Sequence, residues 1–394
     1  MSLIAHLADL HIGYSHMNQR AADGRNQRMV DFERAALLAA DRVIAARPDA
    51  AIIAGDFLHE TQLYPSALTG AAAFCKRFAD AGIPLIAIGG NHDEAEGEGR
   101  YNALLYLAER HGLELHLAQG TRDVAGVRLH LVSFRVISRA ISGRGEIAAF
   151  DFSREHPNVL VAHGYAPGEG VPELPADRDV RIPEEWLSDP RFACVMLGHI
   201  HHHTRLREDP PVFYAGSTER RNFGEAGERP GFWLHRFEGA ELVESESHFI
   251  DELGDGELPR PMLDEQIDTR EMTFDELDSR VRELIAAAPA GAMMRVVLDN
   301  VSEEIDRQKA KARWEREFRE RGGFSFEAVP RTRQITELLD VKFERPPVDV
   351  GKGLLDFIAE QTAELPEQEA VEIRSLAAGL VSEAREAVLA QDAD

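Results

Sequence analysis

The sequence predicts an α/β protein in which short buried strands alternate with amphipathic helices. Apolar runs of four or five residues recur along residues 1–255 and stop at a glycine or a histidine. Such continuous runs are typical of strands that are covered on both faces. Between them, apolar residues repeat every three or four positions, which indicates helices with one buried side. Strands that alternate with helices in this way indicate a layered α/β domain.

Four apolar runs are clear enough to be predicted as strands. They are 51–54, 84–88, 159–162 and 194–197. Helical spacing predicts helices over 31–46, 71–81 and 102–110, and Pro48 follows the first of them as a stop signal. Because the carboxyl ends of strands in open α/β sheets form the usual ligand-binding edge, the residues that follow these strands are candidates for a site.

The chain of 394 residues is longer than a single core of about 250–300 residues usually supports. Glycine and proline cluster at 254–261, so we expect a first domain over 1–255. Residues 263–329 predict a small β-α-β-α-β unit with helices at 274–287 and from Ser302 to about Arg321, and strands at 293–298 and 324–329. Beyond Pro346-Pro347, a third segment over 348–394 predicts two helices, at 350–361 and 367–390.

Composition limits the possible functions. The formal net charge of −25 argues against a broad nucleic-acid surface, although bound divalent cations can supply positive charge locally. No apolar run reaches the length of about 18 residues that a membrane span needs, and no secretion signal is visible. Cys75 and Cys194 are too few for a disulfide framework, so we expect two buried thiols and a cytoplasmic protein.

Five short motifs place histidines and carboxylates directly after the expected strands. They read Asp9-Leu10-His11, Gly55-Asp56, Asn91-His92-Asp93, His163-Gly164 and His199-Ile200-His201. Taken singly, each has an ordinary interpretation as a turn-forming aspartate or asparagine, or as a structural histidine. Their order and their shared position favour a metal site, and the mixture of carboxylate and imidazole suits Mn²⁺, Fe²⁺ or Zn²⁺.

The motifs predict ligands for two adjacent ions. Asp9, His11, Asp56 and His201 would surround one ion, and Asp56, Asn91, His163 and His199 the other. His92 would face the substrate as a general acid, with Asp93 holding its second ring nitrogen. His202 and His203 would be exposed or lie behind the ligands. Two such ions activate water and stabilise the attacking and leaving oxygens of a phosphoryl group, so we expect hydrolysis of a phosphate ester.

These motifs resemble those of the calcineurin-like metallophosphoesterase superfamily over residues 1 to about 250. Within it the chain looks most like the SbcD nuclease family. That resemblance rests on residues 7–13 (LADLHIG), 55–59 (GDFLH), and 215–220 (AGSTER) with 223–225 (FGE). It implies a two-sheet β-sandwich flanked by helices, a small α/β cap domain that guides DNA, and C-terminal helices.

The resemblance also implies roles and partners. His92 would be the catalytic acid, His59 would lie near the scissile phosphate, and two Mn²⁺ ions would be the cofactor. The substrate would be DNA, and the C-terminal helices would dock on an SbcC-type coiled-coil ATPase. A homodimer is compatible with this plan.

Two segments keep an alternative interpretation. The basic helix within 302–321 either tracks phosphates or is a solvated helix with Trp314 packed inward. The acidic C-terminal helix, with an apolar stripe at residues 373, 377, 380, 384 and 388, either docks on a partner or packs on its own domain.

Two other functions compete with a DNA nuclease. The first is a phosphomonoesterase or cyclic-nucleotide phosphodiesterase of the same superfamily; such enzymes often lack a segment like 263–394. The second is a scaffold without catalytic activity, which the complete set of candidate ligands disfavours.

Overall fold

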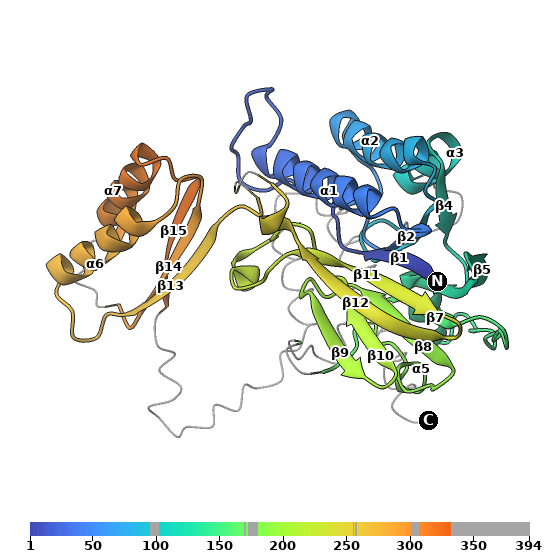
Figure 1. Ribbon diagram of the computed structural model, residues 1–394. Coiled ribbons are helices and arrows are strands. Elements are labelled where there is room, and N and C mark those ends of the chain that lie inside the picture. Colours follow the sequence, from blue (N-terminus) through green and yellow to red (C-terminus); the bar gives the residue numbers. More distant parts are fainter. Residues whose placement is uncertain are drawn as a thin grey trace, which may run out of the picture. The chain divides into compact units, whose positions relative to one another are not determined.

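The computed structural model describes residues 1–94, 102–168, 171, 180–254, 256, 258–301 and 307–331 (Figure 1). The chain divides into two compact units, residues 1–332 and 333–394. The two C-terminal helices predicted at 350–361 and 367–390 lie outside the described residues, as does Ser302.

Two six-stranded sheets form the main body of the first unit. The strands of the first sheet, in spatial order, are β12 (Glu241–Phe249), β11 (Gly231–Glu238), β1 (Ser2–Leu7), β2 (Ala50–Ala54), β3 (Leu85–Ile88) and β4 (Leu113–His116). Those of the second are β5 (Gly120–Val124), β6 (Val127–Val132), β7 (Asn158–His163), β8 (Phe192–Gly198), β10 (Pro211–Tyr214) and β9 (Thr204–Glu208). Strands β1 to β4 run parallel, and so do β6, β7 and β8.

Side-chain alternation along the strands produces the layers. Ile52 and Ile86 of the first sheet pack with Leu129, Val161 and Met196 of the second in a shared core. The opposite face of the first sheet is covered by α1 (Gln27–Ala46), α2 (Pro65–Ala81) and α3 (Ala103–His111). The expected two-sheet sandwich flanked by helices is therefore confirmed.

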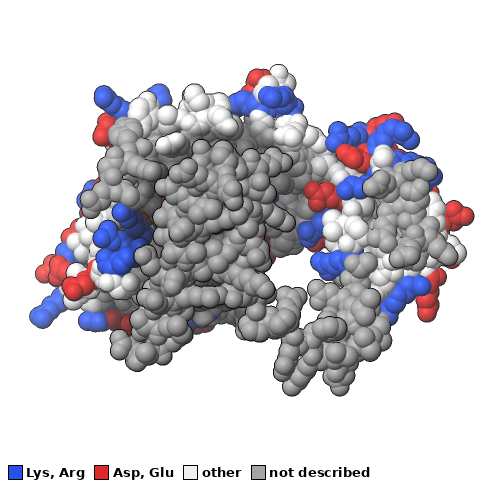
Figure 2. Space-filling view, turned by 180° about the vertical axis from the view of Figure 1, so that it is seen from behind, with Lys and Arg blue, Asp and Glu red and all other residues white. Residues whose placement is uncertain are grey.

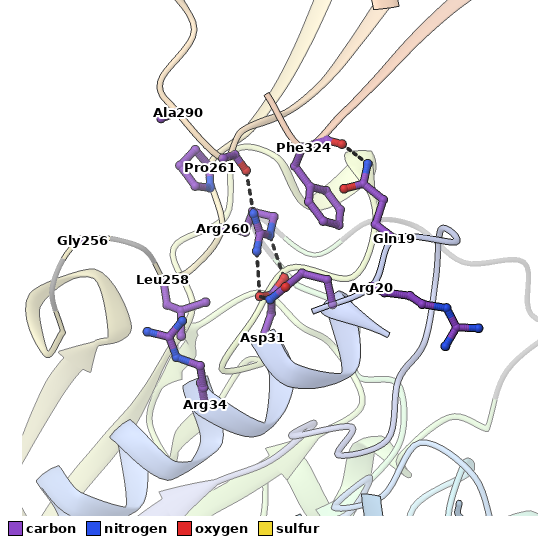
Figure 3. Close-up of a pocket in the computed structure, with 12 residues that line it drawn as sticks. Gln19, Arg20, Asp31, Arg34, Gly256, Leu258, Arg260, Pro261, Ala290 and Phe324 are labelled. Carbon is purple, nitrogen blue, oxygen red and sulfur yellow. Dashed lines mark hydrogen bonds and ion pairs between the residues drawn. The ribbon is translucent and has the colours of Figure 1, made fainter. Parts of the chain in front are cut away.

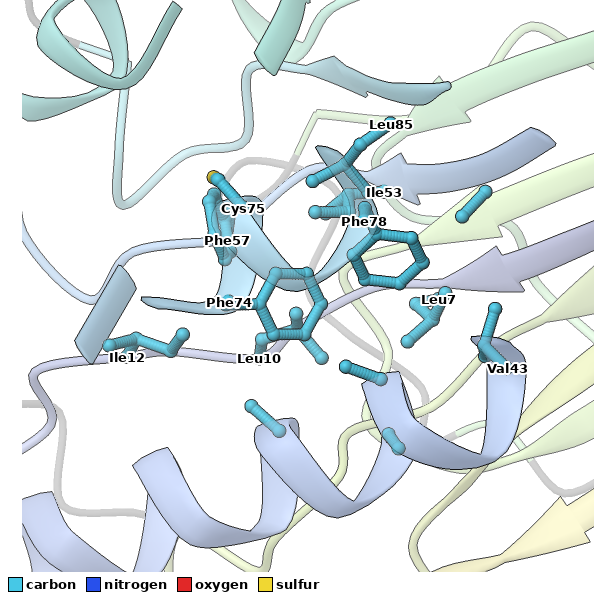
Figure 4. Packing of buried hydrophobic residues seen from close by; sticks show 14 of the residues in the cluster. Leu7, Leu10, Ile12, Val43, Ile53, Phe57, Phe74, Cys75, Phe78 and Leu85 are labelled. Carbon is cyan, nitrogen blue, oxygen red and sulfur yellow. The ribbon is translucent and has the colours of Figure 1, made fainter. Parts of the chain in front are cut away.

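Figure 4 shows the packing beneath these helices. Phe78 of α2 lies beside Leu7 of β1 and Phe74 beside Leu10, and Val43 of α1 belongs to the same buried cluster (Figure 4). The outer face of the second sheet packs against α4 (Phe134–Ile141) and α5 (Glu184–Leu187). Each sheet therefore has two buried faces, which explains why its parallel strands read as continuous apolar runs.

Helix α1 begins earlier than its apolar pattern predicts. The side chain of Asn26 accepts hydrogen bonds from the amides of Arg28 and Met29, which caps the helix before Gln27. Arg28 and Asp31 are then fully buried, although their charge makes them look like surface residues. Helix α2 likewise begins at Pro65, at a position where proline needs no hydrogen-bond partner.

Residues 262–331 form the predicted β-α-β-α-β unit. Its parallel strands are β13 (Met262–Asp268), β14 (Met293–Asp299) and β15 (Ser325–Arg331), and its helices are α6 (Phe274–Ala287) and α7 (Arg307–Glu320). A capping box between Thr273 and Glu276 fixes the start of α6.

Trp314 of α7 is buried in the core of this β-α-β-α-β unit. Its exposed fraction is 1%, and its indole N–H donates to Asp278 Oδ1 at 2.7 Å. Arg313 pairs with the same Asp278, and Arg319 pairs with Glu315. These contacts favour the solvated-helix interpretation of the basic segment, because part of its charge is already neutralised.

The surface carries charges of both signs. On the face that Figure 2 shows, Lys and Arg side chains of the described residues lie among Asp and Glu side chains. Cys75 and Cys194 are buried free thiols, as predicted. No helix in the described ranges combines the length and the apolar character that crossing a bilayer would require.

Candidate metal centre

The predicted ligands meet at one rim of the sandwich because their strands end there. Asp9 and His11 follow β1, Asp56 follows β2, and Asn91 follows β3. The second sheet contributes the remaining ligands: His163 is the last residue of β7, while His199 and His201 follow β8. The centre therefore draws its ligands from both sheets.

The first group of ligand atoms lies around His11. Its Nε2 is 3.0 Å from Nε2 of His201 and 3.7 Å from Oδ2 of Asp56. The ligand atoms of Asp9, His11 and His201 all lie within 4.8 Å of one another. Asp9 and His11 are fully buried.

The second group lies around Asn91. Its Oδ1 is 3.0 Å from Nε2 of His163 and 3.0 Å from Nδ1 of His199. Oδ2 of Asp56 is 3.5 Å from His163 Nε2, so the same carboxylate oxygen approaches both groups. The structure thus brings all the predicted ligands together, with Asp56 between the two groups.

Neighbouring acceptors orient the ligand imidazoles. His163 donates from Nδ1 to the carbonyl of Ala54 at 2.8 Å, which turns Nε2 toward Asp56. His201 lies with Nδ1 3.0 Å from Oε1 of Glu225, which leaves its Nε2 facing His11. A carboxylate or carbonyl behind the ring is the usual support of a metal-bound histidine. Sequence reasoning gave Glu225 no role beyond its place in the Phe-Gly-Glu motif.

Burial and mutual contacts perturb the ionisation of these groups. Burial raises the pKa of Asp9. Burial would also raise the pKa of Asp56, but His163 and His11 outweigh it and hold that pKa below its ordinary value. Burial opposes charge on His163, yet Asp56 and Asp9 raise its pKa to about 9. The imidazole of His163 and the carboxylate of Asp56 thus stabilise each other's charged forms, and binding of a metal by His163 Nε2 would require loss of its proton.

The donor set fits divalent metal ions. Nitrogen and oxygen acceptors from separate strands converge at distances of 3.0–3.7 Å, where unshared lone pairs repel unless a proton or a cation lies between them. Imidazole, carboxylate and amide oxygen together suit Mn²⁺, Fe²⁺ or Zn²⁺.

The backbone of the site occupies unfavourable conformations. Asp9, His11, Asp56 and His199 have φ angles of 52°, 43°, 51° and 103°, in the region that favours glycine. Such conformations persist only where the surrounding structure enforces them, and they concentrate at functional sites. At Gly90, a Cβ atom would lie 2.2 Å from Oδ1 of Asp56, so this loop needs a glycine to approach the ligand.

His92 lies beside the first group of ligands, and its contacts define its tautomer. Nδ1 is 3.1 Å from the carbonyl oxygen of His59, which can only accept, so Nδ1 carries the proton. Nε2 accepts from Arg221 Nη1 at 3.2 Å. The rings of His59 and His92 are stacked with centroids 4.9 Å apart.

Asp93 does not hold the ring of His92 as expected, and this prediction was wrong. Its buried carboxylate accepts from the amides of Gly90 at 2.8 Å and Leu58 at 3.2 Å, and burial raises its pKa to about 7. The carboxylate of Asp93 is thus bound by the backbone amides of Gly90 and Leu58, and the carbonyl of His59 orients the ring of His92 instead. Asp93 therefore supports the loops that carry Asn91 and His59.

His202 and His203 are half-buried rather than exposed. His202 contacts Glu228. His203 lies 2.7 Å from the carbonyl of Ala215 and stacks on Trp233 with ring centroids 4.3 Å apart. Neither belongs to a ligand group found among the described residues.

Two adjacent groups of candidate metal ligands that approach one shared carboxylate, at the rim of a two-sheet sandwich, are the arrangement expected of a dinuclear metal hydrolase. The chain belongs to the calcineurin-like phosphoesterase family, whose sequence profile matches residues 2–203. Membership of this family implies divalent metal ions and confirms the resemblance inferred from the motifs.

Curated relatives share a name from DNA repair. A "DNA double-strand break repair protein Mre11" from Haloferax volcanii is 33% identical over 241 residues, which cover 60% of this chain and 50% of the relative. The protein of the same name from Archaeoglobus fulgidus is 28% identical over 307 residues, or 70% of this chain and 65% of the relative. The chain thus spans about half to two thirds of the length of these relatives.

A dimetal phosphatase from Danio rerio is among the similar solved structures. Its TM-score is 0.37 and its sequence identity 11%, over 63% of this chain and 99% of that structure.

Proposed function

We propose that the protein is a two-metal nuclease that hydrolyses phosphodiester bonds of DNA, with Mn²⁺ as the metal. One observation carries this proposal: Oδ2 of Asp56 lies within 3.7 Å of both ligand groups, so a single carboxylate can bridge two ions. When bound, the ions would activate a water molecule and neutralise charge on the phosphoryl oxygens.

The side chains divide the remaining work. Asp9, His11, Asp56 and His201 would hold one ion, and Asp56, Asn91, His163 and His199 the other. We assign to His92 Nε2 the proton that passes to the leaving oxygen as the phosphorus–oxygen bond breaks. That nitrogen accepts from Arg221 here, so it can carry a proton only after the guanidinium has turned away. His59, stacked on His92, is a candidate contact for the phosphate.

The choice of DNA as substrate rests on two supports. The curated relatives are named for DNA double-strand break repair. The second support is the small domain, which small-substrate enzymes of the superfamily often lack. The short helix η1 (Phe223–Glu225) contributes Phe223 to a cluster with Met262, Met293 and Phe324, so the small domain packs on the helix that supplies Glu225 to the centre.

A cleavage assay tests the proposal. End-labelled duplex and single-stranded DNA are incubated with the full chain and Mn²⁺, beside a small diester and a monoester, with and without a chelator. We expect chelator-sensitive cleavage of DNA and of the diester. Hydrolysis of the monoester without cleavage of DNA would favour the phosphomonoesterase alternative.

We also propose that residues 349–394 dock on a coiled-coil ATPase of the SbcC type. This segment holds 11 acidic and 3 basic residues, with an apolar stripe on its last predicted helix. Deleting residues 349–394 should abolish co-purification with the ATPase and spare metal-dependent cleavage. Unchanged co-purification would instead indicate that the segment packs on its own chain.

A further inference from the structure

Arg221 is an arginine at the metal centre that the sequence motifs did not single out. Its Nη1 donates to His92 Nε2 at 3.2 Å. Among the described residues, its guanidinium has no carboxylate partner within ion-pair distance, in contrast to Arg28 and Arg229, which each pair with two carboxylates. A guanidinium has five N–H donors and no acceptor, so most of its hydrogen-bonding capacity is unused here.

The backbone that carries Arg221 is held from several sides. Its amide donates to Glu225 Oε2 at 2.7 Å, and its carbonyl accepts from the hydroxyl of Tyr14 at 2.9 Å. Two residues earlier, the fully buried carboxylate of Glu219 accepts from the amides of Arg220 and Arg260, each at 3.0 Å. The main chain of Arg221 is therefore held in place, whereas its guanidinium makes a hydrogen bond to His92 alone among the described residues.

The surroundings of this guanidinium are cationic once metal is bound. The ring nitrogens of His11, His59 and His92 lie within 4.8 Å of one another, and His11 also belongs to the first group of candidate ligands. Two divalent ions beside an arginine repel it unless an anion lies between them. The anion that reaches such a centre during phosphoester hydrolysis is the phosphoryl group, and a guanidinium matches two of its oxygens with a planar fork.

We propose that Arg221 binds a non-bridging oxygen of the phosphate that is being cleaved, and so acts as a substrate-binding residue beside His92. The inference rests on the proposed function and adds a residue to the same site. Arg221 contacts His92 in the absence of substrate and moves to the phosphate when substrate binds. The same movement frees His92 Nε2 for proton transfer.

The affinity for inorganic phosphate distinguishes two roles of Arg221, binding of the phosphate and positioning of His92. The probe is inorganic phosphate, titrated calorimetrically into the Mn²⁺-loaded full chain. We expect Arg221→Gln to weaken phosphate binding about tenfold or more, and Arg221→Lys to weaken it less, because lysine keeps the charge and loses the fork. The KM for a small diester should rise in parallel.

Arg236→Gln is the matched control. Arg236 pairs with Glu244 on the surface and lies opposite Leu3, at the end of β1 away from the ligands. Removing this arginine changes the net charge equally and should leave phosphate affinity unaltered.

Several results would overturn the proposal. A folded Arg221→Gln protein with wild-type phosphate affinity does so, as does a fall in kcat with unchanged KM, which would make Arg221 only a positioning residue for His92. Should Arg221→Gln fail to fold, wild-type phosphate affinity in Arg221→Lys has the same meaning. The two proposals fail in distinguishable ways. If the proposed function is wrong, the wild-type chain cleaves neither DNA nor the diester; the role of Arg221 is tested separately, by comparing the phosphate affinity of the variants with that of wild type.

Discussion

Asp31 lies at the centre of a buried charge network, and replacing it with asparagine should strongly destabilise the protein. Its carboxylate accepts from Arg260 at 2.7 and 2.8 Å (Figure 3). It also accepts from Arg28 Nη1 at 2.8 Å and from Gln27 at 3.0 Å. Asp31, Arg28 and Glu219 are fully buried. Burial would raise the pKa of Asp31, but Arg260 and Arg28 hold it below its ordinary value.

The magnitude follows from the charge balance. Arg28 and Arg260 face two carboxylates, Asp31 and Glu219. The Asp31→Asn change leaves the guanidinium of Arg260, which is 13% exposed, without a carboxylate partner, because only Arg28 also pairs with Glu219. Breaking a buried pair in this way costs about 3–5 kcal/mol. Because the asparagine oxygen still accepts one hydrogen bond, we expect about 3 kcal/mol, a large part of the roughly 5–15 kcal/mol of a typical domain.

Urea unfolding followed by circular dichroism measures this loss as a shift of the midpoint at constant slope. Glu244→Gln provides the control, since it breaks the exposed pair with Arg236 and should cost less than about 1 kcal/mol. An Asp31→Asn protein that unfolds within about 1 kcal/mol of wild type would refute the reasoning, because the network would then add nothing to stability.

Three further predictions concern the centre and the core. His92→Gln should lower kcat on DNA by about 10²–10⁴-fold and affect a p-nitrophenyl diester much less, since its leaving group needs no acid; equal losses would contradict the acid role. Glu225→Gln should weaken metal binding about 10–100-fold in a calorimetric titration, because His201 loses its supporting carboxylate; unchanged affinity would argue against that support. Burial and nearby His203 lower the pKa of His6 from 6.5 to about 3, although its hydrogen bond to Leu197 opposes them. Only the unfolded chain therefore gains this proton below pH 6.5, and the free energy of unfolding should fall by about 1.4 kcal/mol per pH unit down to about pH 3. In urea titrations at several pH values, His6→Gln should reduce the dependence of the unfolding free energy on pH by about 1.4 kcal/mol per pH unit. An unchanged pH dependence would exclude His6 as its source.

Local sequence signals were sufficient for much of the fold, and they singled out candidate ligands that the structure brings together at one rim. Asp56, Asn91 and His163 lie at or just after the ends of apolar runs, and parallel strands bring such positions to one rim of the sheets. The helices and strands of residues 262–331 could also be predicted, because turn and cap residues such as Thr273 delimit them.

Contacts between distant segments could not be read in this way. Arg28 resembles a surface residue in the helical pattern, and part of what balances its buried charge is Glu219, far along the chain, beside the nearby Asp31. The partner of His92 Nδ1 is the carbonyl of His59, which could not be predicted because a backbone oxygen has no sequence signature. The contacts of Arg221 and Glu225 could not be predicted either, because they depend on how the segment around η1 packs against the site.

The origin of the ligands in both sheets has a consequence for assembly. Each ligand group combines side chains from the β1–β3 ends with side chains from the β7–β8 ends. A cation held there would cross-link the two halves of the sandwich, and an unfolded chain could not offer the same set of donors. Metal binding would then be linked to folding, so that the stability of the folded sandwich would rise with the concentration of free metal.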